Sequence, residues 1–434
     1  MNISFYNGED IQLKNIKTEG KGNLSDNEIN AKYLKGEVRI ITEQARYPLD
    51  TITGMLDSGK YNLNPEFQRR HRWTDGQKSR LIESFIMNVP IPPIFLYEVK
   101  YSNYEVMDGL QRLSTIYDFY ADKFELRDLE YWKELEGRRY STLPEEVRLG
   151  IDRRYLSSII LLKETAKSQE EELRLKQIVF ERINSGGTKL EYQESRNALY
   201  PGKFNDLCIR LARHSVFCEI FAIPMPNEDE KLTGIPNPGL EGNDTYSKMR
   251  DVETVMRFFA MRHVDKFNGR QKDFFDHFTE AANHLSDDVM KQYECLFDRT
   301  IRFAYDLLGV GAFGVWKTDK EGHWFFVERP NVYLYDPIMV VLSQMLNNTD
   351  RLLANKDRIR TGMKQLFIDN EILREGRQTS KSAIESRMDV IYSFLAKLHI
   401  IDRWLKLDEQ TGREMFRKLV GEVRGTFKGV EYSE

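Results

Sequence analysis

Hydrophobic residues between positions 63 and 120 follow strand and helix spacing in turn. Residues 74–86 begin with a Thr-x-x-Gln capping box, and their apolar side chains then recur on one helical face. Residues 91–99 and 104–107 read as strands, the first with prolines only at its start. The pattern changes at Gly109, after which residues 110–120 form an amphipathic helix. We therefore expect a compact unit of helix, strand, hairpin, strand, glycine turn and helix.

Further strands are predicted at residues 38–42 and 156–162, the second a continuous apolar run. Residues 49–58 and 168–183 have helical patterns. From residue 191 onward the pattern is mostly helical, with loops at 224–242 and 309–316. Helices are expected at residues 192–199, 202–217, 251–263, 270–284, 286–307, 335–347, 350–368 and 380–398.

The fold class that follows is α+β, with an α/β domain before a mostly helical region. We expect a flexible, polar arm over residues 1–35, an α/β domain over 36–220 and a helical domain over 221–434. A chain of 434 residues is long enough for such a division.

Composition narrows the class of protein without naming a function. Charged residues make up 30% of the chain and the net charge is −4, so the overall charge gives no reason to expect nucleic-acid binding. The chain has 3 scattered cysteines, which fits a reducing compartment rather than a disulfide framework. Since no signal peptide or membrane-spanning run is visible, we expect a cytoplasmic protein without a membrane partner.

The glycine turn carries the clearest candidate chemistry. Asp108, Gln111 and Arg112 surround Gly109, and the first turn of the helix that follows has unpaired N–H groups that attract anions. This combination indicates a site for an anionic ligand. An ordinary strand-to-helix turn, capped by Asp108 and with Arg112 in a salt bridge, explains the same spacing.

Two other segments carry weaker signals of the same kind. Gln68, Arg69 and Arg70 follow a proline on an irregular segment, and arginine matches phosphate with two parallel hydrogen bonds. Asn184 and Gly187 lie where the helix over 168–183 stops, and exposed amides there suit an anion. A solvated charged loop and a simple helix C-cap are the respective alternatives.

Three motifs follow one another along the chain, namely Pro65-Glu-Phe-Gln-Arg-Arg-His-Arg-Trp73, Asp108-Gly-Leu-Gln-Arg112 and Phe180-Glu-Arg-Ile-Asn-Ser-Gly-Gly-Thr-Lys-Leu190. In this order they resemble a prokaryotic domain family with a DGQQR signature, typified by the S-half of GmrSD-type restriction proteins and related in fold to ParB and sulfiredoxin. The resemblance covers about residues 35–220. It implies a ParB/sulfiredoxin-like domain that binds, and in several members hydrolyses, a nucleoside triphosphate in an anti-phage restriction system.

The resemblance also implies roles for individual residues. Asp108, Gln111 and Arg112 would be catalytic, with Asp108 holding Mg²⁺. The residues implied in nucleotide binding are Gln68, Arg69, Arg70, Gly109, Ser114, Thr115, Asn184 and Gly187.

One departure from the family pattern keeps other functions open. Leu110 replaces the first glutamine of the signature, so the domain would bind nucleotide yet turn it over poorly. The alternatives are a non-catalytic module that senses nucleotide or DNA for a separate nuclease, and a ParB-like DNA nickase. We expect no C-terminal His-Asn-His nuclease domain, because residues 221–434 contain no matching His-centred metal motif. We also expect no sulfiredoxin-type reductase, because no cysteine lies near the signature. The sequence leaves open whether the protein forms a homo-oligomer.

Overall fold

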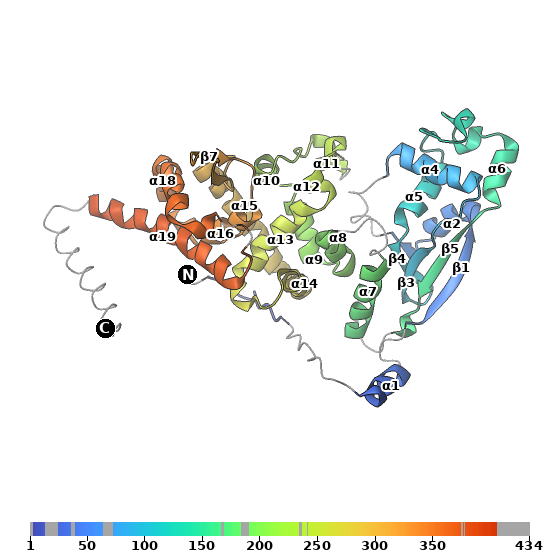
Figure 1. The fold of residues 1–434 in the computed structure, drawn as a ribbon, viewed down its shortest axis with the longest axis horizontal. Helices are drawn as coiled ribbons and strands as arrows, with labels where there is room; N and C mark the ends of the chain where they lie inside the picture. The colour runs from blue at the N-terminus through green and yellow to red at the C-terminus, as the bar shows by residue number, and fades with distance from the viewer. Residues whose placement is uncertain are drawn as a thin grey trace.

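The computed structural model describes residues 3–13, 25–35, 40–63, 73–165, 169–183, 191–233, 237–240, 242–374, 376 and 378–405. These residues form a mixed sheet with its helices, here called the sheet unit, followed by a largely helical region (Figure 1). The predicted α+β class is confirmed. No helix within the described ranges has the length and apolar character needed to cross a membrane.

The sheet has five strands in the order β1 (Thr42–Pro48), β5 (Tyr155–Leu161), β3 (Ile94–Lys100), β4 (Asn103–Asp108) and β2 (Tyr61–Asn62). Strand β1 pairs with β5, and β3 with β4, in antiparallel fashion. Strand β3 is parallel to β5, and β2 is parallel to β4. The carboxyl ends of β2 and β4 therefore point to the same edge of the sheet.

One face of the sheet is covered by α2 (Ile52–Asp57), α4 (Asp75–Ile86) and α5 (Leu110–Tyr120), with α6 (Glu145–Asp152) beside them. The predicted capping box is present at the start of α4, where the Thr74 side chain accepts the Gln77 N–H. Apolar side chains from α4, α5 and alternate strand positions form one core.

The opposite face of the sheet packs against α7 (Gln169–Ile183). Tyr97 and Met107 on the strands share an apolar cluster with Phe180 of α7. Lys176 Nζ lies 2.5 Å from Glu105 Oε2, and both side chains are nearly buried. This ion pair fastens α7 to β4.

The helical region is built around its own, larger core. Its helices are α8 (Tyr192–Leu199), α9 (Lys203–Leu211), α10 (Ser215–Ile220), α11 (Glu228–Thr233), α12 (Asp244–Ser247), α13 (Arg250–Arg262), α14 (Gln271–Ala282), α15 (Asp287–Leu308), α16 (Val332–Gln344), α17 (Thr349–Ala354), α18 (Lys356–Asp369) and α19 (Lys381–Leu405). Phe204 and Phe217 belong to this core, so α9 and α10 pack with the helical region. The predicted division into domains at residues 35 and 220 stays a prediction.

Residues 3–13, which the sequence places in a flexible arm, lie against the helical core. Ile11 is fully buried there, and Glu9 makes buried contacts with α13. A short helix, α1 (Asp26–Lys35), follows, and Figure 1 shows it apart from both regions. The sheet unit is thus an insertion between two chain segments that share the helical core.

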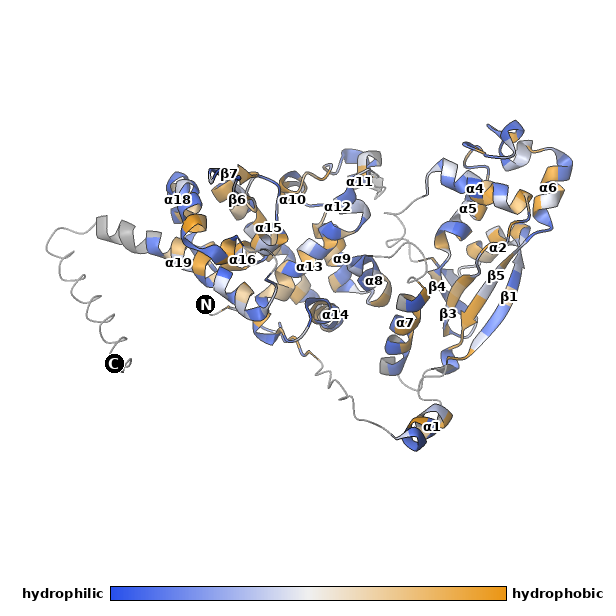
Figure 2. Ribbon diagram, in the orientation of Figure 1, coloured by the Kyte–Doolittle hydropathy of each residue, from blue (hydrophilic) through white to orange (hydrophobic). Residues whose placement is uncertain are grey.

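The structure corrects several predicted elements. The predicted helix over 202–217 is divided into α9 and α10, the predicted helix over 350–368 is divided into α17 and α18, and the predicted loop over 224–242 contains α11. The first strand is predicted at residues 38–42, of which 38 and 39 lie outside the described ranges, whereas β1 runs from Thr42 to Pro48. It is an edge strand with a mostly exposed, hydrophilic sequence (Figure 2), so it lacks the apolar run that the prediction followed. The predicted loop 309–316 leads into an antiparallel hairpin of β6 (Val315–Thr318) and β7 (Trp324–Val327).

Glu83 of α4 fixes the loop that follows α5. Its buried carboxylate accepts the backbone N–H groups of Glu130, Tyr131 and Trp132 at 3.2, 2.8 and 2.9 Å. Burial raises the pKa of Glu83, but the three N–H donors outweigh it and hold the pKa below its usual value of 4.5.

We expect Glu83→Gln to destabilise the sheet unit by about 1–3 kcal/mol, because buried N–H groups lose an ionised acceptor. The free energy of unfolding measured in urea checks this, with the exposed Glu134→Gln as control. Since the folded pKa is depressed, the Glu83 contribution is full above pH 4.5 and disappears as the pH falls through the lowered value. Equal unfolding curves for Glu83→Gln and wild type would contradict the assignment.

Candidate functional site

The turn between β4 and α5 is built on Gly109. Its φ of +95° lies in the left-handed region, and a Cβ there would stand 2.2 Å from Ile94 Cγ2. Both the backbone conformation and the neighbouring strand require a residue without a side chain. The predicted change from strand to helix at this glycine is confirmed.

We expect Gly109→Ala to destabilise the sheet unit by about 2–4 kcal/mol, from backbone strain together with overpacking against Ile94. Gly59→Ala is a matched control, because Gly59 also has a positive φ of +70° but no atom lies within 4 Å of its added Cβ. Thermal unfolding of the two variants separates the two causes of destabilisation, because Gly59→Ala has the backbone strain alone and Gly109→Ala has both the strain and the steric clash with Ile94. Equal losses in both would show that the contact with Ile94 is unimportant.

Arg112 is held inside the turn by neighbouring backbone and by Asp108. Its Nη2 lies 2.7 Å from Asp108 Oδ2, and its Nη1 donates to the carbonyl oxygens of Pro92 and Pro93. The side chain of Arg112 is 11% exposed, against 36% for Asp108. The salt bridge that the sequence left open as an alternative is therefore present. Arg112 orients the Asp108 carboxylate and ties α5 to the start of β3.

Gln111 connects the turn to the first motif. Its Oε1 accepts the backbone N–H of Trp73 at 3.2 Å. Trp73 itself packs against the apolar core of the sheet unit. Asn62, the last residue of β2, pairs with Glu105 of the parallel strand β4, three residues before Asp108. Trp73, the last residue of the first motif, is thus held at the first turn of α5.

The other predicted site residues differ in accessibility. Ser114 and Leu110 are half-buried, whereas Thr115 is only 1% exposed and lies inside the sheet unit. The predicted residues outside the described ranges are Gln68, Arg69, Arg70, Asn184 and Gly187.

Helix α7 lies on the other face of the sheet and runs in the direction of the turn at Gly109. It follows the end of β5, where Leu161 pairs with Tyr97, and its Lys176 meets Glu105. From Lys176 to Ile183 the helix rises by roughly 10 Å, about the length of β4 from Glu105 to Asp108. Ile183 packs in the same cluster as Phe95, the strand partner of Asp108. The third motif thus begins within α7, and Ile183 is its last residue that the structure describes.

Asp108 is the residue of the turn best suited to a metal ion. Its Oδ2 is engaged by Arg112, and Oδ1 has no partner among the described residues. Elsewhere, Asp319, Glu321 and His323 have ligand atoms within 4.8 Å of one another on the exposed β6–β7 turn. Their grouping follows from Asp319 accepting the N–H groups of Glu321 and His323, as in ordinary turns.

Sequence patterns missed the groups that hold the site in place. The carbonyls of Pro92 and Pro93 and the N–H of Trp73 are backbone atoms, which residue identity does not mark. The Lys176–Glu105 pair joins residues 71 positions apart. No local spacing signals such a contact.

Comparison with known families supports the resemblance drawn from the motifs. Residues 52–201 match the family model described as GmrSD restriction endonuclease, N-terminal domain. Residues 342–426 match a model described as a protein of unknown function, DUF2764. Comparison with curated proteins gives no significant match, and neither does comparison with solved structures. The first match spans the whole Asp108–Arg112 turn and the strands that carry it, so residues 52–201 form a domain of the GmrSD restriction endonuclease N-terminal family.

Proposed function

We propose that the sheet unit binds a nucleoside triphosphate with Mg²⁺ at the Asp108–Arg112 turn, hydrolyses it, and serves a prokaryotic restriction or anti-phage system. The observation that carries the proposal is the half-exposed Asp108 carboxylate beside the first turn of α5, on a backbone that requires glycine. Helix N-termini of this kind favour phosphate, and glycine lets the phosphate approach the backbone.

The flanking elements supply the rest of the proposed site. Trp73, which ends the first motif, contacts Gln111 of the turn. Ile183, within the third motif, packs against the same apolar cluster as Phe95, the strand partner of Asp108. Gln68, Arg69 and Arg70 would contact the phosphates, and Asn184 and Gly187 would close the far side. Phosphoryl transfer depends mainly on positioned cations and hydrogen-bond donors, and these motifs provide such groups.

Asp108 Oδ1 suits Mg²⁺, which commonly takes one carboxylate together with phosphate oxygens and waters. A bound Mg²⁺ would neutralise phosphate charge. Arg112 would keep the carboxylate in place, because three of its contacts already fix its guanidinium. Gln111 would orient the attacking water only after releasing Trp73, so in this arrangement it positions the first motif instead.

Leu110 supports a second candidate function. It is the first residue of α5 and places an apolar, half-buried side chain where the family signature has glutamine. In this second function the domain binds nucleotide as a switch and a separate nuclease cuts DNA.

The test is hydrolysis and equilibrium binding of ATP, GTP, CTP and UTP by the full chain with Mg²⁺, with and without DNA. Mg²⁺-dependent turnover supports the enzyme. Saturable binding without turnover supports the switch, and Leu110→Gln should then raise turnover. Relaxation of supercoiled plasmid without nucleotide would favour a nickase. Absence of both binding and turnover contradicts the proposal.

A further inference from the structure

Helices α7 and α8 lie between the sheet and the helical region (Figure 1). Helix α7 forms an ion pair with the sheet, whereas α8 forms ion pairs with the helical region. On α7, Lys176 pairs with Glu105 of β4 at 2.5 Å, with side chains only 10% and 13% exposed. We therefore treat α7 as part of the sheet unit, which moves together with the strands. Removing one partner of such a buried pair leaves the other charge uncompensated.

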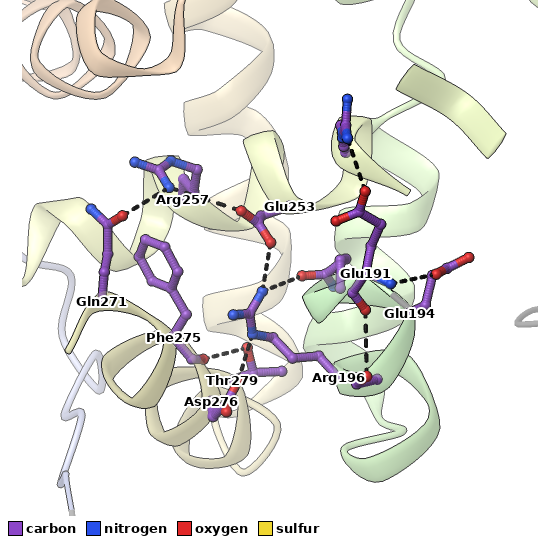
Figure 3. Close-up of polar contacts among 12 residues, drawn as sticks. Glu191, Glu194, Arg196, Glu253, Arg257, Gln271, Phe275, Asp276 and Thr279 are labelled. Atoms are coloured by element: carbon purple, nitrogen blue, oxygen red, sulfur yellow. Dashed lines mark hydrogen bonds and ion pairs between the residues drawn. The ribbon is translucent and has the colours of Figure 1, made fainter. Parts of the chain in front are cut away.

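Helix α8 is fastened to the helical region by Arg196. Its guanidinium lies 2.6 Å from Asp276 of α14 and 2.9 Å from Glu253 of α13, and it donates to Gln193 at 3.0 Å. Figure 3 shows Arg196 between these acids, with Phe275 nearby. Burial raises the pKa of Asp276, whereas Arg196 opposes that rise, so the two charges depend on each other.

A second buried arginine contacts one acid of this network, since Arg257 Nη1 lies 3.9 Å from Glu253 Oε1. Arg257 of α13 bonds to Asp336 of α16 and reaches Gln271 at the start of α14 (Figure 3). Sliding α8 along α13 by one helical turn would separate the buried Arg196 from the buried Asp276 and leave both charges without this partner. Buried ionic networks of this kind are best attested as devices that fix register.

The contact between the two fastened helices has a different character. Val179 and Phe180 of α7 share a small apolar cluster with Ala198 and Leu199 of α8. Apolar contact has little directional preference, so its free energy changes slowly when one surface rolls on the other. Modest interfaces between regions of one chain commonly permit relative motion.

We propose that α8 is a fixed part of the helical region and that the sheet unit, carrying α7, rocks against it on the apolar contact around Leu199. The N-terminal connection is anchored in the same way, since Glu9 is buried against Arg262 and His263. Both chain connections of the sheet unit therefore begin at buried charges in the helical core. This inference concerns the free protein and does not depend on what the sheet unit binds.

Distances between spin labels test the proposal without any nucleotide. Cys295 is exposed on α15, whereas Cys208 and Cys218 are buried, so Cys295 accepts one label. The partner label goes on Tyr101→Cys, 76% exposed in the sheet unit, or on Tyr192→Cys, 49% exposed on α8. We expect a broad distance distribution for the Tyr101 pair and a narrow one for the Tyr192 pair.

Two variants make the test decisive. Leu199→Ala should shift or widen the Tyr101 distribution and leave the Tyr192 distribution narrow. Arg196→Met should widen the Tyr192 distribution, with Arg250→Met, which removes the exposed pair with Glu191, as its control. Equally narrow distributions for both label pairs would overturn the proposal, as would a Tyr101 distribution that Leu199→Ala leaves unchanged. Circular dichroism verifies that each variant is folded.

Discussion

Asp108→Asn is expected to reduce nucleoside triphosphate turnover by about 100-fold or more, the scale of losing one key electrostatic group in an active site. The substitution keeps the size of the side chain and an oxygen for Arg112, so the turn should stay folded. It removes the negative charge that the proposed site offers to Mg²⁺ through Oδ1. The measurement is steady-state phosphate release at saturating nucleotide, repeated over a range of Mg²⁺ concentrations.

Asp118→Asn is the matched control for this variant. Asp118 is also on α5 but pairs with Lys78 and Lys123, away from the glycine turn. Its turnover should stay within about twofold of wild type, since surface ion pairs contribute about 0–1 kcal/mol to stability and none to the proposed chemistry. Equal losses in the two variants, or an unchanged Mg²⁺ dependence in Asp108→Asn, would contradict the role given to Asp108.

Glu9→Ala is expected to destabilise the helical region by about 3–5 kcal/mol, as for other buried ion pairs that lose one partner. Glu9 accepts from Arg262, His263 and Tyr293 at 3.0, 3.0 and 2.9 Å, and its side chain is fully buried. Without it, Arg262 keeps a buried charge with fewer acceptors. The checks are the free energy of unfolding and hydrogen exchange of residues 3–13, which should become fast. Asp10→Asn, an exposed neighbour, should change neither.

The same cluster predicts how stability depends on pH. Burial lowers the pKa of His263 below its usual value of 6.5. Burial alone would raise the pKa of Glu9, but the hydrogen bond from His263 and the charge of Arg262 outweigh it and lower the pKa of Glu9 below its usual value of 4.5. Both folded pKa values are depressed, so both contributions are present near neutral pH. Stability should fall with acidification, first below pH 6.5 through His263 and then below pH 4.5 through Glu9. Unfolding free energies that stay constant between pH 7 and pH 4 would contradict this account.

Local sequence signals predicted the elements that carry the candidate site. The capping box at Thr74, the prolines before β3 and the glycine after Asp108 each act within a few residues, and the structure has them as expected. The signature at Asp108–Arg112 likewise predicted the family that residues 52–201 match. These signals share one property, namely that the physical cause is adjacent in the chain.

Contacts between distant residues were not predictable in this way. Glu9 looks like one more acid in a polar segment, yet it is buried by residues more than 250 positions away. Arg196 likewise depends on Asp276, 80 positions along the chain. At the turn itself, the partners of Arg112 and Gln111 include backbone atoms of Pro92 and Trp73. Tertiary packing alone brings these groups together.

Photochemical crosslinking of an azido nucleoside triphosphate to the full chain, followed by peptide mapping, tests the central claim most directly. The nucleotide that binds best in the Mg²⁺ assays is the probe, and unlabelled nucleotide is the competitor. The account predicts saturable, Mg²⁺-dependent labelling within residues 104–120 or in the flanking first and third motifs, and its loss in Asp108→Asn. Saturable labelling confined to residues 203–405, or no saturable labelling at all, would contradict a nucleotide site at the Asp108–Arg112 turn.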